Sequence, residues 1–117
     1  MNLTYNYIYK IISKRYRTPS YILIFSNRKN NIEVNFNDIE TLYDTLIKIK
    51  KSIVKDVIEY IGDDFEDNIC IKKNNKNYKF TITKKYHTIK DDYIKYIDFN
   101  IKYIDLEYIL NDIELEL

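Results

Sequence analysis

Small and chemically special residues are scarce in this chain of 117 residues, which has one glycine, one proline, one cysteine, one histidine and no tryptophan. Phosphate-cradling loops and many catalytic loops rely on glycine, because the backbone must approach the ligand closely there. A single glycine therefore argues against those classes of site. The lone Cys70 can form no disulfide within the chain and excludes every multi-cysteine zinc pattern.

Long apolar runs and a recognisable leader are also missing. The longest uninterrupted apolar run is Tyr21–Phe25, far short of the roughly 20 residues that span a bilayer. The N-terminus has neither a compact apolar segment nor a small-residue cleavage site of the secretory kind. We therefore expect no membrane contact and a reducing, cytoplasmic location, which would be the host cell cytoplasm if the chain is of phage or viral origin.

Apolar residues nevertheless make up 45% of the chain and charged residues 32%, a balance typical of a folded domain. The length suits one domain, residues 1–117. Isoleucine, lysine, asparagine and tyrosine dominate, and these are residues with A/T-rich codons, so much of the bias reflects the gene. The sequence alone indicates a fold class more clearly than a function.

The spacing of apolar residues predicts seven elements in the order α-β-β-α-β-β-β, with an end that fits either a helix or a strand. The expected elements are a short helix over 3–16, strands 21–25 and 32–36 joined by a turn at 27–30, a helix of about 24 residues between a cap at Asn37 and a C-cap at Gly62, strands 69–71 and 78–82, and a strand from 96 to 103. We predict an α+β fold: an antiparallel sheet of about five strands, one long helix packed across it, and a short N-terminal helix.

Charge is distributed unevenly, although the net charge is only +1. Residues 1–29 contain six basic residues and no acid, whereas residues 91–117 contain eight acids and two lysines. Two interpretations stay open: the ends neutralise each other in the fold, or each presents a charged surface to a partner.

Candidates for catalysis are few. Cys70 and His87 are the one available thiol and imidazole, but Cys70 lies between two isoleucines and suits a packed position. The acidic run 62–67 fails the spacing of a helix–loop–helix calcium loop. We predict no catalytic residue, no metal ligand, no cofactor and no enzyme activity.

Two binding surfaces remain as hypotheses. The acidic, tyrosine-bearing C-terminal third is the predicted site for a larger protein or ribonucleoprotein complex with a basic surface, because tyrosine is enriched in interface hot spots. The predicted residues are Tyr96, Asp98, Tyr103, Asp105, Glu107 and Tyr108. The alternative is nucleic-acid binding by the basic, tyrosine-rich N-terminal segment, through Lys10, Lys14, Arg15 and Arg17.

A short, A/T-biased chain without motifs is similar in general type to small proteins of phages, viruses and mobile elements, among them anti-CRISPR proteins. That analogy implies a non-enzymatic binding protein that occludes or inhibits a larger macromolecule of the host's defence. A toxin-immunity protein would have a similar sequence, and an exposed strand edge could also support a homodimer.

Overall fold

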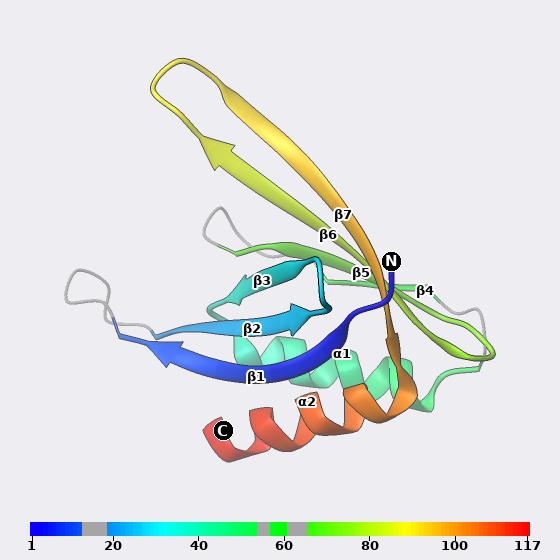
Figure 1. Ribbon diagram of the computed structural model, residues 1–117. Coiled ribbons are helices and arrows are strands. Elements are labelled where there is room, and N and C mark those ends of the chain that lie inside the picture. Colours follow the sequence, from blue (N-terminus) through cyan, green and yellow to red (C-terminus); the bar gives the residue numbers. More distant parts are fainter. Residues whose placement is uncertain (13–18, 54–56, 61–65) are drawn as a thin grey trace.

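The structure of the protein, a computed structural model, describes residues 1–12, 19–53, 57–60 and 66–117. It is an α+β fold (Figure 1). Its elements are β1 (Thr4–Ile11), β2 (Ser20–Ser26), β3 (Asn31–Phe36), α1 (Ile39–Lys51), β4 (Val57–Tyr60), β5 (Asn68–Lys73), β6 (Asn77–His87), β7 (Asp92–Lys102) and α2 (Tyr103–Glu116).

Within the described residues the strands form two antiparallel sheets, one of three strands in the order β1-β2-β3 and one of four in the order β4-β5-β6-β7. The residues that precede β1 join the two sheets. The Leu3 amide donates to the Asn100 carbonyl at 2.9 Å, and the Asn100 amide donates to the Met1 carbonyl at 2.8 Å. Met1–Leu3 thus lies beside β7, parallel to it, before the chain enters β1.

The core lies between the two sheets and the two helices. Phe25 of β2 packs against Phe80 of β6 and Phe99 of β7, with ring centroids 5.8 and 4.9 Å apart. Both helices lie on the same side of the molecule, with α2 against β1 and α1 against β4 (Figure 1). They bury apolar residues at helical spacing: Ile39, Leu42, Leu46 and Ile49 from α1, and Leu106, Ile109, Leu110 and Ile113 from α2.

The predicted single sheet of about five strands, crossed by one long helix, is therefore wrong, as is the order α-β-β-α-β-β-β. The described chain has two sheets, two helices of similar length and the order β-β-β-α-β-β-β-β-α. Alternation within a strand indicates which face is buried but not which sheet the strand joins, because pairing is decided between distant segments.

The predicted N-terminal helix is a strand, β1, and an irregularity in its pairing explains the error. The register with β2 shifts between Tyr5 and Tyr7, so Asn6 is an extra residue opposite β2. A bulge of this kind interrupts strict alternation. Leu3, Tyr5 and Ile8 then face inward at spacings of two and three, which imitate the spacing of a helix.

The predicted long helix ends early, at Lys51. Ser52 is extended, and its amide and hydroxyl both donate to the Ile49 carbonyl, at 3.3 and 2.7 Å. The Lys73 ammonium of β5 donates to the Lys50 and Ser52 carbonyls at 2.8 and 3.0 Å, which satisfies acceptors at this helix end. The contact with Lys73 is tertiary, and the spacing of apolar residues could not reveal it.

The N-terminus of that helix also differs by one residue from the prediction. Asp38, not Asn37, caps it, because the Asp38 carboxylate accepts from the Thr41 amide at 3.0 Å and from the Thr41 hydroxyl at 2.6 Å. The hydrogen bond from the Thr41 side chain holds the pKa of Asp38 below its ordinary value. The C-cap predicted at Gly62 lies outside the described residues.

Two hairpin predictions are confirmed. Residues 21–25 and 32–36 form β2 and β3, and residues 69–71 and 78–82 lie in β5 and β6. The ambiguous end of the chain is a helix, α2. The predicted strand 96–103 begins earlier, at Asp92, and ends at Lys102. The additional residues, 92–95, extend the strand beyond the sheet.

Candidate functional site

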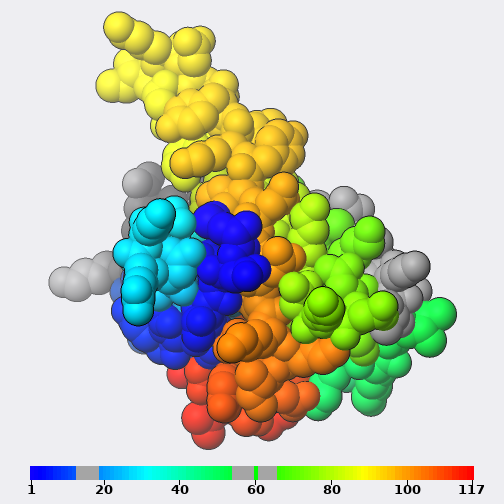
Figure 2. All heavy atoms as spheres, turned by 45° about the vertical axis from the view of Figure 1, so that its right-hand side comes forward, coloured from blue at the N-terminus to red at the C-terminus, as the bar shows by residue number. Residues whose placement is uncertain are grey.

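The strands β6 and β7 extend beyond the sheet to which they belong. Pairing between β5 and β6 ends at Asn68 and Thr83, whereas pairing between β6 and β7 continues without a register shift to His87 and Asp92. Residues 84–95 therefore form a two-stranded hairpin, which we term the arm. The arm projects from the rest of the molecule, which we term the body (Figure 1), and Figure 2 shows it standing clear of the body in a second view.

Local contacts hold the arm in shape. The rings of Tyr86 and Tyr93, which lie opposite each other, stack with centroids 4.9 Å apart and planes 14° from parallel. The Asp91 amide donates to the Thr88 hydroxyl at 2.9 Å across the tip, and that hydroxyl donates back to the Asp91 carbonyl. A cross-strand aromatic pair and a closed tip favour one conformation of a hairpin that the body does not cover.

Large apolar side chains of the arm and its base are exposed. Ile89 at the tip is fully exposed, and Tyr93, Ile94 and Tyr96 are 51%, 54% and 69% exposed. Such residues contribute nothing to the core of the body. Grouped apolar side chains on a projecting segment are typical of a surface that a partner covers.

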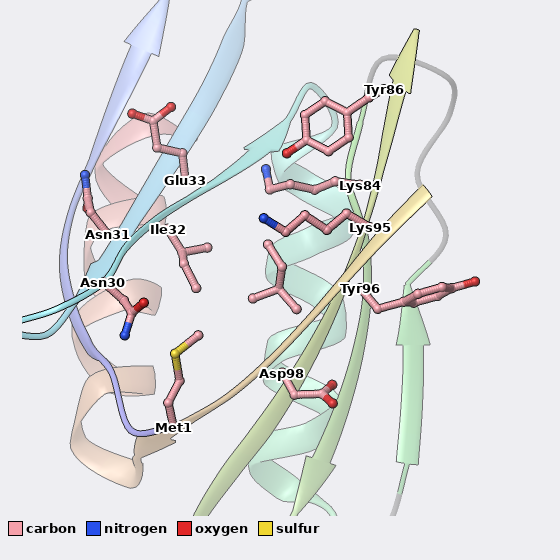
Figure 3. A pocket seen from close by; sticks show the side chains of 11 residues that line it. Met1, Asn30, Asn31, Ile32, Glu33, Lys84, Tyr86, Lys95, Tyr96 and Asp98 are labelled. Atoms are coloured by element: carbon pink, nitrogen blue, oxygen red, sulfur yellow. The ribbon is translucent and has the colours of Figure 1, made fainter. Parts of the chain in front are cut away.

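A groove lies at the base of the arm, between the arm and β3, with a volume of about 630 Å³. Figure 3 shows Lys84, Tyr86 and Lys95 reaching from the arm toward β3, and Ile32 reaching back toward the arm. Met1 lies at the lower end. The groove thus combines apolar and cationic residues on the arm side with Glu33 and two asparagines on the β3 side, and it adjoins the exposed residues of the arm.

The two lysines of the groove differ in their partners. Lys84 forms an ion pair with Asp67 at 2.8 Å, and the same carboxylate oxygen accepts from the Asn35 amide at 2.8 Å. The pair is largely buried, with side chains 16% and 13% exposed, so Lys84 ties the base of the arm to the edge of β3. Among the described residues Lys95 has no ion pair. Lys95 is therefore the cation of the groove that a partner can use.

The six residues of the predicted protein-binding site do not lie on one strand. Tyr96 and Asp98 are exposed on β7, beside the groove. The other four belong to α2, because the chain turns from strand to helix between Lys102 and Tyr103. The structure therefore divides the predicted set between two surfaces.

Two acids of that set make contacts within the fold. Asp105 is buried in the first turn of α2 and accepts from the Lys102 amide at 3.3 Å. Burial raises the pKa of the Asp105 carboxyl, although hydrogen bonds from the Lys102 and Tyr5 amides oppose that rise. Glu107 forms an exposed ion pair with Lys50 of α1 at 2.9 Å.

Two further acids of α2, Asp112 and Glu114, also make contacts within the fold. The Tyr5 hydroxyl donates to Asp112 and the Tyr43 hydroxyl donates to Glu114, both at 2.6 Å. Burial, followed by the contact with Asp112, raises the pKa of Tyr5 far above its ordinary value. The carboxylates of α2 thus help to dock this helix on β1 and α1, and they are less available to a basic partner than their number suggests.

The two tyrosines of α2 also differ from each other. The Tyr103 hydroxyl donates to the Asn74 carbonyl, and its ring lies 4.9 Å from that of Tyr78. Tyr108 is 53% exposed and lies on the outer face of α2. Only Tyr96, Asp98 and Tyr108 of the predicted set are exposed without an internal contact within the described chain.

The alternative nucleic-acid site is described only at one residue. Lys10 is exposed on β1, and its ammonium lies 6.0 Å from the centroid of the Tyr21 ring. Lys14, Arg15 and Arg17 lie outside the described residues. The basic cluster on which that hypothesis depends thus stays a prediction.

Cys70 and His87 cannot act as a pair. Cys70 lies opposite Thr81 of β6, and His87 is six residues further along that strand, about 20 Å at the usual rise per residue. His87 instead contacts Asp92 across the arm at 3.1 Å.

Among the described residues no group of three or more histidine, cysteine, aspartate or glutamate side chains could hold a metal ion. Most of the acidic run 62–67 lies outside them. No helix in the described ranges has both the length and the apolar character to cross a membrane.

The arm is the feature that the sequence analysis missed. Residues 83–95 contain tyrosine and isoleucine between charged residues, a pattern that lies between the predicted strands 78–82 and 96–103. A signal was present, since Lys84–His87 and Asp92–Lys95 flank a four-residue turn with threonine, lysine and aspartate, which suits a hairpin. Nothing in that pattern shows that the hairpin projects from the body.

Comparison of the chain with protein-family models, with curated proteins and with solved structures finds no match.

Proposed function

We propose that this chain is a small, non-enzymatic binding protein that engages a larger protein partner through the arm and the adjoining groove. The observation that carries the proposal is the projection of residues 84–95 from the body with large apolar side chains exposed. Tyrosine and isoleucine bury large areas on binding, and tyrosine does so with little loss of rotamer freedom.

The charge of the arm favours a protein partner over a nucleic acid. Lys84, Lys85, Lys90 and Lys95 are accompanied by Asp91 and Asp92 close to the tip. Asp91 and Asp92 adjoin Lys90 at the leading end, so the tip lacks the continuous basic surface that binds phosphates, whereas a mixed set of charges suits the rim of a protein interface. Nucleic-acid binding remains the alternative, to be detected by a steep fall of affinity with salt.

We propose occlusion as the mode of action. A hairpin that stands clear of its body can enter a cleft of a larger macromolecule while the body blocks the approach to that cleft. Small antagonists of host defence from phages and viruses, including anti-CRISPR proteins, often block a larger macromolecule, and the chain resembles them in size and composition.

Site-specific photocrosslinking tests the proposal. Three tyrosines of nearly equal exposure lie on three faces: Tyr93 on the arm at 51%, Tyr108 on α2 at 53%, and Tyr7 on β1 at 54%. Each is replaced in turn by p-benzoylphenylalanine in cells that make the protein naturally. We expect position 93 to capture one partner protein strongly and positions 7 and 108 to capture it weakly.

The matched positions make the result decisive. Capture of a protein mainly at position 108 would favour α2 as the interface and contradict the proposal. Capture of nucleic acid at position 93 would support the alternative. Purified complex then gives the affinity, which Tyr93→Ala and Ile94→Ala should each lower by about tenfold or more, as for hot-spot residues.

A further inference from the structure

The edge of β7 that faces away from β6 is already used at one end. The Asn100 amide and carbonyl both point away from β6, where they bond to the Met1 carbonyl and the Leu3 amide. Met1–Leu3 therefore behaves as a short additional strand, parallel to β7. This pairing shows that the β7 edge accepts a neighbouring strand at the base of the arm.

The same edge continues up the arm. Pairing between β6 and β7 has no register shift, so every second residue of β7 directs its amide and carbonyl the same way as Asn100. The residues concerned are Asp98, Tyr96, Ile94 and Asp92. Within the described chain no backbone hydrogen bond reaches these groups from outside the β6–β7 ladder. The edge from 92 to 98 spans about 20 Å at the usual rise per residue.

Part of the groove wall is made of this main chain. Tyr96 and Asp98 line the groove, yet Figure 3 shows that their side chains point away from β3. They can therefore line it only through the backbone. An incoming extended segment would meet unpaired amides and carbonyls on this side, and Ile32 and Ile97 below them.

We propose that an extended strand of the protein partner pairs with the edge of β7 between Asp92 and Asp98, continuing upward from the place that Met1–Leu3 occupies. The inference rests on the proposed function, which it deepens by naming the mode of recognition. Strand addition supplies affinity through main-chain hydrogen bonds and specificity through alternate side chains.

The side chains of the groove define the chemistry of that strand. Side chains of the partner strand that point into the groove would lie over Ile32 and Ile97. Alternate positions of that strand should therefore be apolar. The residue opposite Lys95 should be acidic, because Lys95 has no ion pair among the described residues and opposite charges across a strand pair are favourable.

A second copy of this chain is a poorer occupant. Two β7 edges paired antiparallel about the middle of the free segment would place Lys95 opposite Lys95 and Asp92 opposite Asp98. Like charges directly opposite each other destabilise a strand pair. A different polypeptide meets no such constraint.

A phage-displayed library of linear nonapeptides is the probe for this edge. We expect panning against the full chain to enrich sequences with alternating apolar residues and an acidic residue. A selected peptide should shift the amide resonances of Ile94, Tyr96 and Asp98 in a 15N spectrum more than those of α2. Failure to enrich any peptide, or binding of the peptide elsewhere, overturns the inference.

A pair of variants distinguishes the contribution of the main chain to peptide binding from that of the side chain. Ile94→Pro removes an outward amide without removing a hydrogen bond of the β6–β7 ladder, and proline is tolerated at such edge positions. Ile94→Thr removes most of the apolar side chain and keeps the amide. We expect Ile94→Pro to lower peptide affinity about tenfold more than Ile94→Thr, since it also blocks the approach of the strand.

A change in the peptide gives the same test without altering the protein. N-methylation of the peptide at every second residue removes amides that pair with β7, whereas methylation of the intervening residues does not. One of the two peptides should lose binding at least about tenfold. Equal affinities for both peptides would exclude strand addition, whether or not Ile94→Pro folds.

The two proposals fail in different ways. If Tyr93→Ala abolishes partner binding while Ile94→Pro and the methylated peptides have no effect, the arm binds through its side chains, and only the strand pairing is wrong. If crosslinking captures the partner at α2 and not at the arm, the proposed function itself is wrong.

Discussion

β6 and β7 run from the body into the arm with unbroken pairing, but aromatic side chains that face each other across the two strands are buried in the body and exposed in the arm. Phe80 and Phe99 face each other in the body and are buried beneath Phe25 of the other sheet. Tyr86 and Tyr93 face each other in the arm, where they stack on each other and remain exposed. The same ladder thus serves stability at one end and presents a surface at the other.

The difference arises from what covers the strands. In the body a second sheet and two helices exclude water from the aromatic pair, so burial stabilises the fold. In the arm there is no covering layer among the described residues, and a two-stranded hairpin alone is only marginally stable. The exposed aromatic residues of the arm are therefore the basis of the proposal that a partner covers it. Five predictions test this comparison.

The largest effect is expected in the body. Phe25→Ala leaves a cavity between the two sheets and should lower the free energy of unfolding by about 3–5 kcal/mol. Tyr93→Ala in the arm should lower it by less than about 1 kcal/mol, as for surface substitutions. Urea denaturation measures both. Similar losses for the two variants would show that the arm contributes to the core.

An effect of intermediate size is expected at Asp105, which was predicted from the sequence to face a partner. Asp105→Ala removes the acceptor for the Lys102 amide at a buried position and should cost about 1–3 kcal/mol. Asp98→Ala, an exposed acid on β7, is the matched control and should be nearly neutral. An unchanged free energy of unfolding in Asp105→Ala would contradict the structural role of this carboxylate.

Asp105 also makes the free energy of unfolding depend on pH. Burial raises its pKa, so the folded chain retains this proton to higher pH than the unfolded chain does. Stability from this group is therefore lost as pH rises from the ordinary carboxyl pKa through the raised one. Asp105→Asn should flatten the stability profile in that range, whereas an unchanged profile would contradict the role of burial.

A smaller effect is expected at the helix cap of α1. Asp38→Ala removes the acceptor for the Thr41 amide and should cost about 1 kcal/mol, whereas Asp38→Asn should retain most of the cap. Because the hydrogen bond from the Thr41 side chain lowers the pKa of Asp38, its contribution is complete above the ordinary carboxyl pKa and is lost as pH falls through the lowered one. Thermal unfolding from pH 7 to pH 3 measures this loss.

The smallest effect on stability, with the largest on binding, is expected when the arm is removed. Replacement of residues 85–94 by Asn-Gly closes the hairpin with a favoured turn and keeps Lys84 in its ion pair with Asp67. We expect the free energy of unfolding to change by less than about 1 kcal/mol and partner binding to be lost. A cooperative loss of the whole fold would contradict the separation of arm and body.

Local chemistry was sufficient to predict some elements. The alternation of Ile32, Val34 and Phe36 with polar residues, next to an asparagine-rich turn, predicts the β2–β3 hairpin correctly, because pairing partners are close in sequence. The same reasoning fails at β1, where one extra residue at Asn6 disrupts the period. It fails again at the end of α1, where Lys73 from a later strand binds the last carbonyls.

The sequence also predicted only part of the candidate site. Tyr96 and Asp98 were predicted from composition, and the structure places both beside the groove. Asp105 and Glu107 looked equivalent in the sequence, yet α2 directs one into the interior and the other toward Lys50. Whether a carboxylate is available to a partner depends on which element carries it and on what that element packs against.

The sequence by itself determined that this is a folded α+β chain with little glycine or cysteine for catalysis or metal binding, because composition and short-range alternation are local properties. Tertiary structure alone decided that the strands divide into two sheets and that Glu107, Asp112 and Glu114 of α2 contact Lys50, Tyr5 and Tyr43. It also decided that β6 and β7 extend beyond β5 to form the arm. Those outcomes depend on contacts between residues far apart in the chain. The free energies of such contacts cannot be inferred from a local sequence pattern.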